Sequence, residues 1–169
     1  MNIFVLDRDP VLAARYLADK HVVRMILESF QMLSTVHRVW GSTEGLYKIT
    51  HLHHPCTIWL LTSASNYRWL VSHVEAMHEE YTLRYQKTHK SFRTLYHLVK
   101  DPPLQLEDKG LTPFALAMPE VYKRDDLVLS YRLYYIADKI RLCHWKAPSQ
   151  EPPWFRPMLA NINQLLMKE

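Results

Sequence analysis

The feature that most constrains this chain is a stretch of two-sided helical periodicity near its start, from Leu17 to Val36. At about 100° per residue, its apolar side chains gather on one broad face that can cover a hydrophobic core. That face consists of Val22, Val23, Met25, Ile26, Phe30, Leu33 and Val36. The pattern predicts a long amphipathic helix and favours a mainly α-helical fold.

The opposite side of this helix carries a mixture of polar groups. These residues are Lys20, His21, Arg24, Glu28, Gln31 and Thr35. A solvated helix face usually repeats Lys and Glu, whereas this stripe combines an imidazole, a guanidinium, a carboxylate and neutral hydrogen-bonding groups. We therefore interpret it as the wall of a functional site. The alternative is an ordinary polar face on which Arg24 and Glu28, four residues apart, form a surface ion pair.

The length and composition fit one domain with one core, because the chain has 169 residues, 48% of them hydrophobic and only three of them glycine. We predict a single compact helical domain over residues 1–169. No apolar run is long enough to span a bilayer, and Asp7, Arg8 and Asp9 interrupt the N-terminus before a signal sequence develops. We expect a cytoplasmic protein with reduced cysteines and no membrane partner.

Local signals divide the chain into an extended N-terminal segment and a series of helices. Residues 3–5 are β-prone, and Asp9 followed by Pro10 predicts a helix start. That helix is expected to run to about His37, with a kink near Asp19. Further helices are expected from Pro55 to about residue 88 with a weak point at 63–66, over 91–99, from Asp125 or Asp126 to about Trp145, and over 154–168. Residues 102–123 form an irregular, proline-bearing stretch.

Several familiar kinds of site are absent from the sequence. His51, His53, His54 and Cys56 are potential zinc ligands, but no second cluster completes a tetrahedral set at a familiar spacing. We therefore predict no metal and no other cofactor. The sequence also has no glycine-rich phosphate loop and no nucleophile elbow.

Charge and aromatic content favour a nucleic-acid partner. The formal net charge is +4, and cations alternate with aromatic residues over 81–93 and 131–145. Such surfaces can hold phosphates and stack an unpaired base. We expect nucleic-acid contacts from Lys20, Arg24, Gln31, His54, Asn66, Arg84, Lys87, Tyr131, Arg132, Tyr135 and Lys139.

The run from Leu17 to His21, with the sequence Leu-Ala-Asp-Lys-His, is followed seven residues later by Glu28. It resembles the first helix of the pyrimidine-dimer DNA glycosylases, small all-α phage-type repair enzymes that carry Leu-Ala-Asp-Gln-His before an essential glutamate. The chain is also similar to phage-encoded proteins that begin Met-Asn-Ile-Phe and carry Asp-Lys-His-Val-Val. The resemblance implies duplex DNA with a flipped-out nucleotide as substrate. It further implies an N-terminal α-amine that attacks the sugar C1′ to form an imine, and a glutamate that assists ring opening and strand cleavage.

Carried onto this sequence, the resemblance assigns catalytic roles to Glu28, Asp19 and His21, and the amine to Met1. As a class, α-amines have pKa values near 8, so a fraction is nucleophilic at neutral pH. Asn2 is a large second residue, which favours retention of Met1, so the family's small N-terminal residue is absent.

Two other positions depart from the family pattern. Lys20 replaces its glutamine, and Leu27 stands where the family has an arginine, so that Arg24 is not the family's arginine.

Three functions stay open at this point. The first is a DNA glycosylase, with lyase activity through the amine or without it through an activated water. The second is another base-modifying or nucleotide-processing enzyme, and the third is a non-catalytic nucleic-acid-binding module.

Overall fold

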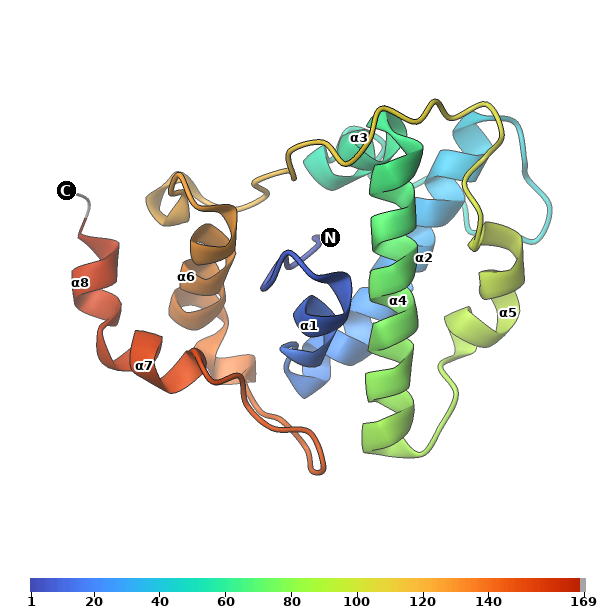
Figure 1. Cartoon of the computed structure of the whole chain (residues 1–169). Coiled ribbons are helices and arrows are strands. Elements are labelled where there is room, and N and C mark those ends of the chain that lie inside the picture. Colours follow the sequence, from blue (N-terminus) through green and yellow to red (C-terminus); the bar gives the residue numbers. More distant parts are fainter. Residues whose placement is uncertain (168–169) are drawn as a thin grey trace.

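The computed structural model describes residues 1–167, which form helices joined by loops (Figure 1). The helices are α1 (Pro10–Arg15), α2 (Asp19–Val39), α3 (Pro55–Thr62), α4 (Ala64–Tyr85), α5 (Lys90–Val99), α6 (Leu127–Lys139), α7 (Phe155–Ala160) and α8 (Ile162–Leu166), with short 3-10 turns η1 (Glu120–Tyr122) and η2 (Ile140–Leu142). No strand occurs within this part of the chain. The mainly helical prediction is confirmed.

Capping side chains fix where the helices begin. Asp9 accepts hydrogen bonds from the first backbone N–H groups of α1, and proline occupies the first helical position. His54 caps α3 in the same way, and Asp126 caps α6. Ser63 is extended and caps α4, so the weak point expected at 63–66 is the boundary between α3 and α4.

Two long helices form the centre of the molecule. The longest, α4, packs against α1 and α2, and α2 also contacts α3 and α5. Helices α6, α7 and α8 form a second group on the other side of the N-terminal segment (Figure 1). One cluster of buried apolar side chains contains members from the N-terminal segment, from α1 to α5 and from α6.

The N-terminal segment is extended, as its sequence predicted, and lies between these two groups of helices. Residues 3–6 are at most 4% exposed. The side-chain amide of Asn2 donates to the carbonyl of Ala117 at 2.8 Å, and Arg132 of α6 donates to the carbonyl of Leu6 at 2.9 Å. These contacts fix the start of the chain against α2 on one side and the C-terminal half on the other.

Some predicted boundaries need correction. The kink near Asp19 is a complete break, because the N–H of Ala18 donates to the Tyr135 hydroxyl rather than to a helical carbonyl. The helix expected to reach Trp145 ends as α6 at Lys139, where the thiol of Cys143 donates to the last carbonyl.

The C-terminus and the core face of α2 also differ from the predictions. The single helix expected over 154–168 is divided into α7 and α8, because Asn161 leaves helical geometry and its side chain donates to the carbonyl of Pro157. Lys168 lies outside the described residues. Val23 was expected in the core but lies at the edge of the apolar face and is 38% exposed.

Candidate active site

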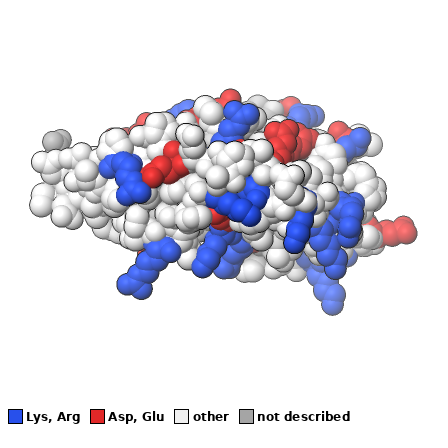
Figure 2. Space-filling view, turned by 90° about the horizontal axis from the view of Figure 1, so that it is seen from below, with Lys and Arg blue, Asp and Glu red and all other residues white. Residues whose placement is uncertain are grey.

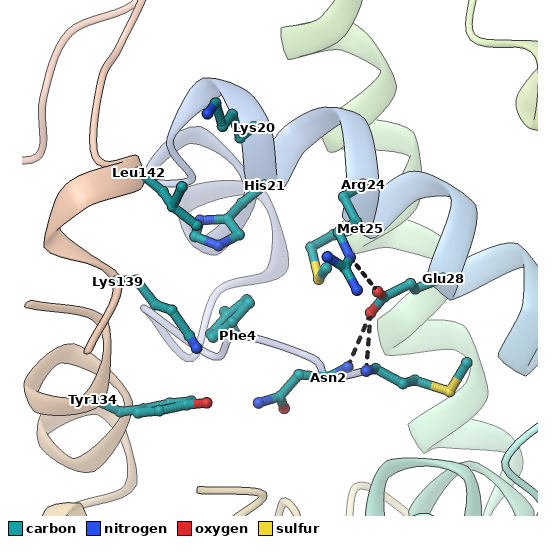
Figure 3. A pocket seen from close by; sticks show the side chains of 11 residues that line it. Asn2, Phe4, Lys20, His21, Arg24, Met25, Glu28, Tyr134, Lys139 and Leu142 are labelled. Carbon is teal, nitrogen blue, oxygen red and sulfur yellow. Dashed lines mark hydrogen bonds and ion pairs between the residues drawn. The ribbon is translucent and has the colours of Figure 1, made fainter.

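A pocket of about 370 Å³ opens beside the N-terminal half of α2 (Figure 3). Its size lies at the small end of the range of about 300–1,000 Å³ that is usual for ligand sites. It is lined by Met1, Asn2, Phe4, Lys20, His21, Arg24, Met25, Glu28, Tyr134, Lys139 and Leu142. One wall therefore comes from α2, the floor from the N-terminal segment and the opposite wall from α6 and η2.

Glu28 connects the α2 wall to the start of the chain. Its Oε2 lies 3.6 Å from the α-amino nitrogen of Met1 and accepts the backbone N–H of Asn2 at 3.2 Å. Its Oε1 accepts the Nε–H of Arg24 at 2.7 Å. The Glu28 side chain is 9% exposed, whereas that of Arg24 is 71% exposed. The carboxylate is therefore held in place while its cationic partner reaches into solvent.

The position of the α-amine is set by groups around the first two residues. The Met1 side chain is only 2% exposed, and His54 makes a hydrogen bond to the Met1 backbone. The Asn2 side-chain oxygen accepts the N–H of Ile3 and lies 3.7 Å from the thiol of Cys56. Burial raises the pKa of Cys56 to about 12, so this thiol keeps its proton and can donate.

His21 lies deeper in the same wall. Its Nδ1 is 2.6 Å from the hydroxyl of Tyr135, and its ring centroid is 5.0 Å from that of Phe4. Burial, together with the positive charges of Lys139 and Arg24, lowers the pKa of His21 to about 4. The imidazole is therefore neutral at pH 7 and acts there as a hydrogen-bonding group rather than as a charge.

The opposite wall combines an aromatic ring with a cation. Lys139 Nζ lies 4.8 Å from the centroid of the Tyr134 ring and also pairs with Asp138. Burial acts to lower the pKa of Lys139, but hydrogen bonds to Asp138 and Tyr134 outweigh it and raise the pKa above its ordinary value. The pocket thus has a stable ammonium group facing the α2 wall (Figure 3).

This arrangement suits a nucleotide. The rings of Phe4 and Tyr134 offer surfaces on which a base can stack, and Lys20, Arg24 and Lys139 offer positive charge for phosphates. In the view from below, Lys and Arg side chains project along one side of the molecule, where acidic side chains are few (Figure 2). A buried carboxylate beside an amine is also a pair of groups that can form and break bonds at a sugar carbon.

Comparison with known families identifies the chain. A family model described as pyrimidine dimer DNA glycosylase matches residues 1–93, which is more than half of the 169 residues. The chain belongs to the pyrimidine dimer DNA glycosylase family. No curated protein and no solved structure gives a significant match. Membership of this family supports a DNA-glycosylase-type activity with DNA as the partner.

Several residues predicted from the glycosylase resemblance, the polar stripe and the basic, aromatic run over 131–145 meet in the pocket. They are Met1, Lys20, His21, Arg24, Glu28 and Lys139. His54 lies just behind them through its bond to the Met1 backbone. Gln31 is half-buried, one helical turn beyond Glu28, and does not line the pocket.

Two predicted residues are instead placed together in a separate cluster. Asp19 accepts hydrogen bonds from Arg84 at 3.0 Å and from His144 at 2.7 Å. The Arg84 side chain is fully buried and also bonds Glu80 at 2.7 Å. Asp19 and Arg84 therefore hold helices together and do not line the pocket, and Arg84 presents no surface to DNA.

The remaining predicted DNA-contacting residues lie in three environments. Asn66 and Tyr131 are fully buried and bond the carbonyls of Trp59 and Ala115. Tyr135 is equally buried and bonds His21 through its hydroxyl. Arg132 is held by Leu6 and Asp7 and lies over the Trp154 ring, whereas Lys87 is exposed in the turn after α4.

Five pocket residues were not among the predicted site residues, and one of them, Met25 of α2, had been expected only in the core. Of the other four, Asn2 and Phe4 come from the N-terminal segment, Tyr134 from α6 and Leu142 from η2. Tyr134 carried a usable signal, because it stands in the aromatic and basic run before Lys139. Phe4 and Leu142 look like ordinary core residues in the sequence, and only tertiary packing brings them to the pocket.

Within residues 1–167, no group of three or more His, Cys, Asp or Glu is arranged to hold a metal ion. None of the helices in this range has the length and apolar character needed to cross a membrane.

Proposed function

We propose that this protein is a DNA glycosylase that removes a damaged or modified base from a nucleotide flipped out of duplex DNA, with Glu28 as the catalytic carboxylate and the α-amine of Met1 as nucleophile. The observation that carries the proposal is the 3.6 Å separation between this amine and the Glu28 carboxylate at one pocket. Membership of the glycosylase family supports the same reaction class.

In the proposed reaction the unprotonated amine attacks C1′ of the deoxyribose. A C–N bond forms at C1′ while the bond between C1′ and the base breaks, and the electron pair of that bond leaves with the base, which is then protonated. Glu28 receives the proton that the new C1′ amine loses. The nitrogen lone pair then forms the C=N bond of an imine as the C1′–O4′ bond breaks, and Glu28 returns the proton to O4′. Removal of a proton from C2′ can then expel the 3′ phosphate, which constitutes lyase activity.

The other pocket residues support binding of the flipped nucleotide. The rings of Phe4 and Tyr134 are neighbours, with centroids 6.1 Å apart, and together offer an aromatic surface that a base can contact, which offsets part of the few kcal/mol that flipping costs. Arg24 and Lys20 lie at the α2 wall, and Lys139 lies opposite them. Their charges can neutralise the phosphates on either side of the extruded nucleotide.

Borohydride trapping tests the proposal directly. The purified protein is incubated with duplexes that carry ultraviolet photoproducts, modified pyrimidines or an abasic site, and base release and covalent adducts are measured together. We expect an adduct that maps to the Met1 amine. Glu28→Gln should lower the rate by about 10²–10⁴-fold. Glu79→Gln, an equal charge change at an exposed position of α4, should leave the rate unchanged.

An N-terminal extension of a few residues tests the nucleophile separately, because it moves the amine away from Glu28. Loss of the adduct with loss of base release supports the amine. Base release that survives the extension and still depends on Glu28 would assign the attack to water instead. If no substrate in the panel loses a base, the glycosylase proposal fails for those lesions.

A further inference from the structure

Behind the pocket wall, the hydroxyl of Tyr135 in α6 contacts two groups at the start of α2. These contacts determine which ring nitrogen of His21 carries the proton. The Tyr135 hydroxyl oxygen lies 2.9 Å from the backbone nitrogen of Ala18 and 2.6 Å from Nδ1 of His21. A backbone amide can only donate, so the hydroxyl oxygen accepts the bond from Ala18. The hydroxyl proton is then left with His21 Nδ1 as its partner among the described residues.

The reverse arrangement is costly. If Nδ1 carried a proton and donated it, the hydroxyl of Tyr135 would accept two bonds and its own proton would have no acceptor. Tyr135 is 0% exposed, so water could not replace that acceptor, and an unpaired buried donor is strongly disfavoured. His21 Nδ1 is therefore the acceptor, and the proton of the neutral ring lies on Nε2.

The Nε2 side of the ring is the side available to a ligand. His21 lines the pocket, and within residues 1–167 its Nε2 has no hydrogen-bond partner and is not enclosed. Phe4 packs against the His21 ring at 5.0 Å and edge-on against the Tyr135 ring at 5.2 Å. This packing restricts rotation of the imidazole.

The charges that face His21 favour the same state. Lys139 from α6 and Arg24 from α2 disfavour a charged imidazole, and Glu28 opposes them more weakly. Burial is the largest effect, and the resulting pKa of about 4 leaves the ring neutral over the range in which most enzymes work. A neutral ring with an unprotonated Nδ1 has a single remaining donor.

We infer that Tyr135 is a positioning residue that holds His21 as a neutral Nε2–H donor, and that this donor binds an acceptor oxygen of the nucleotide in the pocket. The identity of the ligand rests on the proposed function, whereas the tautomer is a property of the free protein. Tyr135 lies beyond the residues 1–93 that match the family model. The C-terminal part of this chain thus supplies the hydroxyl group that fixes the tautomer of His21.

Nitrogen NMR of the full-length protein with labelled histidine tests the tautomer without any substrate. The His21 signals are assigned by their loss in His21→Gln. At pH 7 we expect an unprotonated Nδ1 and a protonated Nε2. In Tyr135→Phe the Nδ1 signal should shift as its donor disappears, and the rate of base release should fall by about 10–100-fold, as is usual for loss of an orienting partner.

Tyr131→Phe is the matched control, because Tyr131 lies on the same helix, is equally buried and uses its hydroxyl to bond Ala115 at 2.6 Å. It should leave the His21 signals unchanged.

A second pair of variants covers the case in which Tyr135→Phe does not fold. His21→Gln can place an amide donor near the Nε2 position and should retain more activity than His21→Asn.

A protonated Nδ1 in the wild-type protein would overturn the inference. So would a Tyr135→Phe variant that matches Tyr131→Phe in both the His21 spectrum and the rate, or equal activity of His21→Gln and His21→Asn. If the expected tautomer is found but no duplex loses a base, the proposed function fails and the action of Tyr135 on His21 stands.

Discussion

The molecule contains two arginine–carboxylate pairs with the same helical spacing and different surroundings. Arg24 and Glu28 on α2, and Glu80 and Arg84 on α4, are each four residues apart, and each pair has an N–O distance of 2.7 Å. The Arg24 side chain is 71% exposed, whereas that of Arg84 is 0% exposed. In one pair the carboxylate faces a pocket, and in the other the arginine is enclosed by protein.

The surroundings decide what each pair can do. All three guanidinium nitrogens of Arg84 are occupied, by Glu80, Asp19, Ser149 and the carbonyls of Leu17 and Arg15. This pair joins α1, α2, α4 and the segment after η2, and no bonding capacity is left for a ligand. Glu28 is close to the α-amine and open to the pocket, so it retains the capacity to act on a substrate. The same spacing thus serves stability in one place and, as proposed, catalysis in the other.

The largest expected difference is in stability. Arg84→Met leaves the buried carboxylate of Glu80 without a cation and removes the arginine partner of Asp19, so it should lower the free energy of unfolding by about 3–5 kcal/mol. Arg24→Met removes a solvent-exposed partner and should change it by less than about 1 kcal/mol. Urea unfolding of the two variants measures both values. Equal losses would show that exposure does not distinguish the pairs.

A smaller difference should appear at acidic pH. Burial raises the pKa of Asp19, but hydrogen bonds from the Lys146 N–H, His144 and Arg84 outweigh it and hold the pKa below its ordinary value. A lowered folded-state pKa contributes stability that is present above about pH 3.9, the ordinary pKa of Asp, and is lost as pH falls through the folded-state value.

Asp19→Asn should therefore lower stability at pH 7, by about 1–3 kcal/mol for the weakened charged hydrogen bonds, and should flatten the loss of stability in acid. Unfolding curves from pH 7 down to pH 3 follow both effects. The exposed substitution Asp125→Asn is the control and should reproduce the wild-type curve. A steep acid loss that persists in Asp19→Asn would place its origin elsewhere.

The smallest expected effect concerns DNA binding by the exposed pair. Arg24→Met should weaken binding to duplexes of any sequence and reduce the salt dependence of the affinity by about one unit of slope, as for the loss of one phosphate contact. Affinity is measured across a series of salt concentrations. Lys109→Met, a loss of charge outside the pocket lining, should leave the slope unchanged, and an equal decrease in both variants would remove Arg24 from the contact surface.

The fold was predictable where its causes are local. Asp9 with Pro10, and Pro55 and Asp126, mark helix starts through their own side chains or rings, and each of these starts is present in the structure. The break before α2 was harder to place, because the N–H of Ala18 bonds a tyrosine that lies 117 residues later. The split of the closing helix at Asn161 depends on a side-chain bond that no apolar periodicity records.

The candidate site was likewise predictable where its residues share one helix, and not where tertiary packing brings them together. The α2 wall could be inferred from helical spacing alone, since Lys20, His21, Arg24 and Glu28 repeat at intervals of three or four residues or lie next to one another. The opposite wall could be inferred only in part: Lys139 was a predicted DNA contact and Tyr134 stands in the same aromatic and basic run, whereas Leu142 reaches the pocket only through tertiary packing. Sequence reasoning also could not separate Arg84 from Arg24, because burial is a property of the assembled fold.

The pocket floor has a consequence for the order in which this protein becomes active during synthesis. The N-terminal segment is made before the C-terminal half, yet several of its contacts are with Ala117, Arg132 and the rings of α6. Closing such distant contacts is entropically expensive and slow compared with forming a single helix. The amine and Glu28 therefore meet in a complete pocket only after residue 142 has been made, and a partial chain should neither bind nor process DNA.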